Sequence, residues 1–236
     1  SEVKVSQVKR KVKIIVLGVC LGLGLVAIQI ILQIDKDVFM TGYWIAALIV
    51  LTGVMLANIL YSVSYQRRMK QIASLLEAGK PQEYVAGVER LLETAKGQNL
   101  RKILIVNLAA GYIDLKQFDE AIELLEGISD KKLVGTAVKT VYRLNLCICY
   151  FQTAQVEKAL ALYHDSQKVF EPQRGGKLYG GNIAILDMLA AIQGKEYGRA
   201  EALLDRARQT WPDRRFQAAF QEVANTLFEI KKENTL

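Results

Sequence analysis

Histidine and cysteine, the side chains on which most protein metal sites depend, are scarce in this sequence. Its 236 residues include one histidine, His164, and three cysteines, Cys20, Cys147 and Cys149. A lone histidine cannot build a zinc site without several thiols or carboxylates nearby, and the cysteines do not have metal-ligand spacing. Cys147 and Cys149 stand two positions apart on a predicted helix, so they point to different faces. We expect no metal, no other cofactor and no disulfide framework, and a reducing compartment fits better.

Signatures of catalysis are missing as well. The sequence has no paired carboxylates within an apolar run, no serine–histidine–aspartate candidate beyond His164 and no cofactor fingerprint. Residues 173–181 (QRGGKLYGG) are rich in glycine, but a phosphate-binding loop needs Ser or Thr after its Gly-Lys pair, and Leu178 stands there. We interpret this segment as a flexible connector. No residue is predicted to be catalytic, and the chain is not expected to be an enzyme.

Acidic residues are almost absent from two basic clusters, and these clusters account for most of the net charge of +7. Residues 1–13 contain five Lys or Arg and one acid, and residues 67–70 contain Arg67, Arg68 and Lys70. Residues 71–236 are nearly balanced, with 22 basic and 21 acidic side chains. Because a nucleic-acid-binding domain would carry a basic face on its folded part, we expect no nucleic-acid partner.

Charged residues are also absent from two stretches of 21 residues, 14–34 and 43–63. A helix of that length spans about 30 Å, the thickness of the hydrocarbon core of a membrane. A signal peptide is the alternative for the first stretch, but its apolar region is normally only about 7–15 residues long. Tyr43 and Trp44 open the second stretch as interfacial anchors would. The short connection between the stretches predicts a helical hairpin that crosses the lipid bilayer twice.

Both basic clusters flank the predicted hairpin on the same side, so the positive-inside rule places both termini in the cytoplasm. We expect an integral protein of a bacterial cytoplasmic membrane in three parts. These are a basic N-terminal segment (1–13), a transmembrane hairpin (14–63) and a cytoplasmic domain (64–236). No proline or glycine lies between Gly53 and Gly79. The second membrane helix is therefore expected to continue into the cytoplasmic domain.

The rest of the chain contains a helix–turn–helix pattern that returns four times. Its clearest copy runs from Asn107 to Ile128, with small residues at Ala109 and Ala121 where two helices would touch. Aligned small residues in the second helices are Gly87, Ala121, Ala159 and Ala200, and three positions before them stand Tyr84, Phe118, Val156 and Tyr197. The intervals between the small residues are 34, 38 and 41 residues. Such units bury their apolar faces only by stacking on their neighbours.

This pattern resembles the tetratricopeptide repeat family, whose helix pairs of about 34 residues stack into an α-solenoid. The first helices match too, because Asn107-Leu108 and Tyr112 recur as Asn145-Leu146 and Tyr150. The family's tryptophan is absent, and Ile105 and Arg143 stand in its place. An apolar stripe in the last segment is typical of a C-terminal capping helix; it comprises Phe216, Ala219, Phe220, Val223, Leu227 and Ile230. The expected fold is all-α, a two-helix transmembrane hairpin followed by a TPR-like helical repeat domain with that cap.

The resemblance implies that the first helices line a groove that binds a protein or peptide segment. By position, the groove would be lined by Asn107, Ala110 and Asp114 from one unit, and by Asn145, Ile148 and Gln152 from the next. Amide side chains suit a peptide because they both donate and accept hydrogen bonds, although the same residues could simply solvate the surface. One subgroup of this family binds C-terminal carboxylates with a clamp of lysine, asparagine and arginine. This clamp is not expected here, because only Asn107 fits it among the residues at the matching positions, Ile72, Leu76, Asn107, Val141 and Asn145.

These expectations favour a membrane-anchored adaptor or scaffold that presents its groove in the cytoplasm. An accessory or assembly subunit of a membrane transporter or other membrane complex is the alternative. Two spans without a charged residue cannot build a transport pathway by themselves, although an oligomer could. The identity of the partner and the oligomeric state do not follow from the sequence.

Overall fold

Helices dominate this protein, and the expected all-α class is confirmed. The computed structural model describes residues 35–233 throughout and, before them, residues 16, 18–20, 22, 24, 27, 29–31 and 33. The structure is 84% helical, and the described residues contain no strand. Two compact units are present, Ser1–Ser64 and Tyr65–Leu236.

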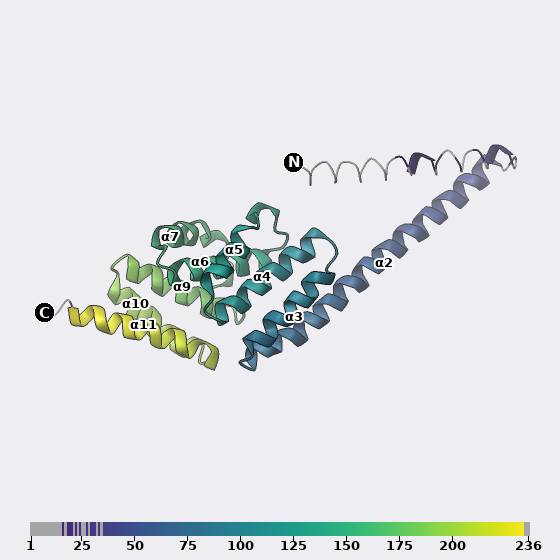
Figure 1. Ribbon diagram of the computed structural model, residues 1–236. Coiled ribbons are helices and arrows are strands. Elements are labelled where there is room, and N and C mark those ends of the chain that lie inside the picture. The colour runs from purple at the N-terminus through teal and green to yellow at the C-terminus, as the bar shows by residue number, and fades with distance from the viewer. Residues whose placement is uncertain are drawn as a thin grey trace. The chain divides into compact units, whose positions relative to one another are not determined.

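The longest element is α2 (Lys36–Glu77), a helix of 42 residues (Figure 1). Asp35 caps its N-terminus, because the Asp35 carboxylate accepts a hydrogen bond from the backbone amide of Asp37 at 2.9 Å. An 18-residue window of α2 has a mean hydropathy of 2.1 with none of it buried, so length and composition would allow α2 to cross a membrane. Because α2 begins at Lys36, most of the connection expected before Tyr43 is helical. The expected segment 1–13 and ten of the 21 residues of the first span, 14–34, lie outside the described residues.

The second unit begins with the last turns of α2 and continues through shorter helices. They are α3 (Pro81–Thr94), α4 (Gln98–Asp114), α5 (Phe118–Glu126), η1 (Asp130–Lys132), α6 (Thr136–Gln152), α7 (Val156–Asp165), α8 (Gln167–Phe170), η2 (Glu171–Gln173), α9 (Gly180–Gln193), α10 (Tyr197–Thr210) and α11 (Arg214–Glu233). The strongest contacts join α3 to α4, α4 to α5, α6 to α7 and α9 to α10. Helix α6 also packs against α4 on one side of the order and α9 on the other, so α4 contacts α6 and α6 contacts α9.

Four helix-to-helix turns share one backbone geometry. Each has a residue with a φ between 55° and 71°, namely Gly79, Lys116, Ala154 and Lys195. In the second turn the backbone amide of Lys116 donates a hydrogen bond to the Ile113 carbonyl at 2.9 Å. The next amide, that of Gln117, donates to the Tyr112 carbonyl at 2.8 Å. The other three turns repeat this pair of hydrogen bonds, which satisfies the last carbonyl groups of a helix when one residue turns left-handed. The helix–turn–helix pattern in the sequence therefore corresponds to four real turns.

Counting from these turns corrects the sequence alignment of the first helix pair. Tyr84, and not Gly87, follows its turn at the same distance as Ala121 follows Lys116. Ala121, Ala159 and Ala200 are fully buried at their helix contacts, as expected. In the first pair the close contact lies one helical turn further on, where a Cβ at Gly87 would lie 3.1 Å from Cγ1 of Ile72. The sequence alignment had therefore matched Gly87 to Ala121 by their close helix contacts and not by their distance from the turn.

Three apolar clusters follow one another through the second unit. The first joins α4, α5, α6 and α7, the next joins α6 through α9, and the last joins α9, α10 and α11. In α11 the buried positions are Phe216, Phe220, Val223 and Leu227, which confirms the apolar stripe predicted there. This stripe packs against α9 and α10.

The end of the glycine-rich segment, Gly180 and Gly181, is not part of the flexible connector that its composition suggested. These two glycines begin α9 and are buried. A Cβ at Gly180 would lie 2.6 Å from the Trp211 ring, and a Cβ at Gly181 would overlap the ring of Phe216. Glycine stands at these two positions because the aromatic side chains after α10 pack directly against the backbone.

Candidate functional site

The six predicted groove residues form two rows on neighbouring helices. Asn107, Ala110 and Asp114 recur at helical spacing on α4, and Asn145, Ile148 and Gln152 recur in the same way on α6. The two helices contact each other. Asp114 and Gln152 are exposed at the ends of the rows, and the other four residues are half-buried. The rows therefore form one partly exposed surface across two helices.

The two asparagine amides are engaged within the protein. The Asn107 Nδ2 donates to the Ile103 carbonyl of its own helix at 2.8 Å. The Asn145 Nδ2 donates to the Val106 carbonyl of α4 at 3.4 Å, so it links the two rows. Each amide nitrogen has a second N–H and each amide oxygen is an acceptor, so both asparagines keep a donor and an acceptor that a partner could use.

Asp114 closes the α4 row next to an unusual tyrosine. The Tyr84 hydroxyl donates to the backbone carbonyl of Asn107 at 2.9 Å, which ties α3 to the start of the row. Burial of the phenol, and then the charge of Asp114, raise the pKa of Tyr84 above its ordinary value. Partial burial of its carboxyl group raises the pKa of Asp114 as well. The carboxyl group of Asp114 lies at the exposed end of the row.

Arg143, which stands where the repeat family has tryptophan, anchors α6 by charge. Its guanidinium forms an ion pair with Asp130 and donates to Asp165 Oδ2 at 2.8 Å and to Ser166 Oγ at 3.1 Å. Only 13% of the Arg143 side chain is exposed. These bonds join α6 to the loop before it and to the end of α7. Sequence reasoning had noted the substitution but could not identify partners that lie 13 and 22 positions away.

A second, partly buried ion pair engages Asp187 of α9. Asp187 accepts a hydrogen bond from the Tyr163 hydroxyl at 2.6 Å and forms an ion pair with Arg174. Its side chain is 13% exposed. Arg174 also donates to Glu171 at 2.7 Å, so its charge is shared among internal partners. This network fastens the segment before α9, and it is structural because its polar groups are occupied by one another.

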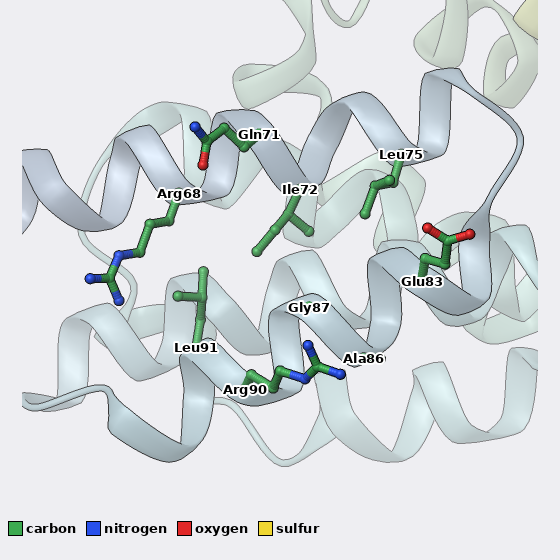
Figure 2. A pocket seen from close by; sticks show the side chains of 9 residues that line it. All are labelled: Arg68, Gln71, Ile72, Leu75, Glu83, Ala86, Gly87, Arg90 and Leu91. Atoms are coloured by element: carbon green, nitrogen blue, oxygen red, sulfur yellow. The ribbon is translucent and has the colours of Figure 1, made fainter.

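The main open cavity lies elsewhere, between the end of α2 and α3 (Figure 2). It has a volume of about 540 Å³. Ile72 and Leu75 of α2 point toward α3, and Leu91 of α3 points toward α2. Polar side chains at its borders are Arg68, Gln71, Glu83 and Arg90. Sequence reasoning missed this groove, because the apolar positions after Arg67 indicated only that the helix continues.

The scarce thiols and the histidine form no reactive centre in the described part of the chain. Cys147 and Cys149 are both fully buried, and burial raises the pKa of each thiol to about 12. They therefore stay protonated and poorly nucleophilic at neutral pH. His164 is exposed on α7 beside the ring of Tyr163. Among the described residues, no cluster of three or more His, Cys, Asp or Glu side chains could hold a metal ion.

In comparisons with known proteins, no family model matches this chain, and no curated protein does either. Function must therefore be inferred from the residues themselves.

Proposed function

We propose that this chain is a membrane-anchored adaptor whose second unit binds a protein or peptide segment. The double row on α4 and α6 carries this proposal, because two adjacent helices present side chains of similar kinds at matching positions. The hydrogen bond from Asn145 of α6 to the Val106 carbonyl of α4 joins the two rows. A surface that is already ordered loses little entropy when it binds an extended segment.

The architecture that we infer is a TPR-like α-solenoid with α11 as its C-terminal cap. The four matching turns support it, as do the buried alanines Ala121, Ala159 and Ala200. The apolar, fully exposed window of α2 supports an anchor in the bilayer. We place this anchor in a bacterial cytoplasmic membrane, as the second of two spans, with both termini in the cytoplasm. The arginines and lysine at 67, 68 and 70 are the observation that favours this side.

Affinity purification of the full chain in mild detergent tests the adaptor proposal. Asn107→Ala combined with Asn145→Ala should reduce partner capture tenfold or more, because two contacts worth about 0.5–1.5 kcal/mol each are lost. Asp114→Arg should have a similar effect by reversing a charge at the end of the row. Glu123→Arg is the matched control, since Glu123 is exposed on the second helix α5. Normal capture by a correctly folded row variant would exclude this surface.

The alternative, an accessory or assembly subunit of a membrane transporter or other complex, is favoured by one feature of α2. Gly53 lies in the apolar part of this helix, and nothing lies within 4 Å of the Cβ that another residue would have there. Such a position suits close packing against a second membrane helix. Gly53→Leu should then release a membrane partner that the row variants still capture. The opposite result, release by the row variants alone, favours the adaptor.

A further inference from the structure

The first and the last helix pairs of the second unit each contain an apolar groove. The α2/α3 groove has been described above. The α10/α11 groove has a volume of about 390 Å³, and its lining residues are Glu201, Leu204, Asp205, Ala224, Leu227, Phe228 and Lys231. Helices α4 to α9 come between the two grooves in the order of packing. Each groove is therefore a separate surface of the same unit.

The two grooves carry opposite unpaired charges. In the α2/α3 groove, Glu83 pairs with Lys80 at 2.9 Å, whereas Arg68 and Arg90 have no ion-pair partner within the described chain. In the α10/α11 groove, Glu201 pairs with Lys231. Asp205 is left without an ion-pair partner among the described residues. One groove thus keeps positive charge at its border, and the other keeps negative charge.

The apolar parts of the grooves are also suited to each other. Phe228 is 66% exposed, although it lies on the helix that packs by its opposite stripe on α9 and α10. An exposed phenylalanine beside an apolar groove marks a surface that gains from burial. Across the α2/α3 groove, Ile72 and Leu75 remain half-buried, so their apolar side chains are partly open to a partner.

We propose that copies of this chain associate head to tail, with the α2/α3 groove of one copy against the α10/α11 groove of the next. In this contact Arg90 and Arg68 meet Asp205, and Phe228 enters the apolar space over Ile72. A second copy fits both grooves together, whereas an anionic lipid headgroup would satisfy the arginines and leave Phe228 and Asp205 unmatched. Because the two surfaces differ, the contact is heterologous and produces rings or open rows.

Disulfide trapping tests the pairing directly. The full chain is prepared in detergent with Cys20→Ser, which removes the exposed thiol, and with either Ala86→Cys or Ala224→Cys. Mild oxidation of a mixture of the two variants should give a cross-linked dimer on a non-reducing gel, and each variant alone should give no cross-link. One chain carrying both changes should give a ladder of oligomers. Self-cross-linking of either single variant, or no cross-link in the mixture, would refute the head-to-tail contact.

Charge reversal gives an independent test by sedimentation in detergent. Arg90→Glu and Asp205→Arg should each weaken self-association at least tenfold and remove its sensitivity to salt. A mixture of the two variants should associate again, because the native charges meet in one contact and the reversed charges meet in the other. Arg208→Glu, an exposed change on α10 outside the groove, should leave association unchanged. A wild-type chain that stays monomeric, or that binds only anionic vesicles through Arg90, contradicts the proposal. Neither variant touches the α4 and α6 rows, so loss of self-association with normal partner capture leaves the adaptor proposal intact.

Discussion

Gly111 of α4 lies directly against the ring of Tyr84 on α3. A Cβ at position 111 would be 2.8 Å from Cδ1 of Tyr84 and 2.7 Å from Cγ2 of Val85. Tyr84 is 2% exposed and occupies the place, counted from the turn, at which the other helix pairs have alanine. The first pair therefore accepts a large side chain because the following helix supplies the missing space.

This relationship predicts that Gly111→Ala destabilises the fold. Alanine in place of glycine normally gains about 1 kcal/mol within a helix. Here the added methyl group would overpack the contact, which typically costs about 1–3 kcal/mol. We expect a lower melting temperature by circular dichroism. Gly198→Ala is the control, because Gly198 of α10 has no atom within 4 Å of its hypothetical Cβ. An equal or higher melting temperature for Gly111→Ala would refute the predicted overlap.

A second prediction concerns the close contact between α4 and α5. Ala109 and Ala121 are both 0% exposed, so a larger side chain has no free space at either position. Ala121→Leu should cost about 1–3 kcal/mol of unfolding free energy through overpacking. Ala161→Leu on α7 is the matched control, because Ala161 is exposed and α7, like α5, is the second helix of its pair. Unchanged thermal unfolding of Ala121→Leu would contradict the packing of this pair.

The third prediction is a dependence of stability on pH. The Tyr150 hydroxyl donates to Glu126 Oε1 at 2.7 Å, and this bond, with Lys158 nearby, lowers the pKa of Glu126 below its ordinary value of 4.5. A carboxyl group whose pKa is lowered by folding stabilises the protein above its unfolded pKa. That contribution is lost as the pH falls through the folded pKa. Tyr150→Phe should therefore lower the melting temperature at pH 7 by more than it does below about pH 4.

Tyr179→Phe provides the control for this comparison. Tyr179 is half-buried, and its hydroxyl has no hydrogen bond among the described residues. Its replacement should shift the melting temperature by a similar amount at both pH values. A Tyr150→Phe effect that is equally independent of pH would show that the hydrogen bond to Glu126 contributes nothing through the carboxylate.

The helical periodicity of the sequence was enough to predict the all-α class and the small residues Ala121, Ala159 and Ala200. These features depend on neighbours within one helix pair, at separations that a repeating pattern makes visible. The register of the first pair could not be predicted in this way. It depends on compensation between Tyr84 and Gly111 on different helices, and no local pattern reports such a contact.

The sequence predicts two rows of residues on neighbouring helices, but not the hydrogen bonds that engage them. The rows on α4 and α6 follow from helical spacing and from the resemblance to a repeat family. The hydrogen bond from Asn145 to Val106 joins residues 39 positions apart, so only the packed helices reveal it. The same reason hides the ion pair between Arg174 and Asp187, which stand 13 positions apart.

The last prediction concerns the side of the membrane on which the second unit lies. The apolar window of α2 is followed by Arg67, Arg68 and Lys70, and a basic cluster beside a span is retained on the cytoplasmic side. In a chain without Cys20, a thiol introduced by Glu77→Cys should react with an impermeant reagent only after the membrane is opened. A thiol introduced by Asp37→Cys, near the other end of α2, should react in intact cells. Labelling of the Glu77→Cys variant in intact cells would show that the second unit lies outside the cytoplasm. That result would contradict the proposal of a cytoplasmic adaptor. A reporter at the N-terminus separates the remaining cases: a cytoplasmic signal requires two spans, whereas an external signal leaves α2 as a single span and shows that the hairpin is wrong.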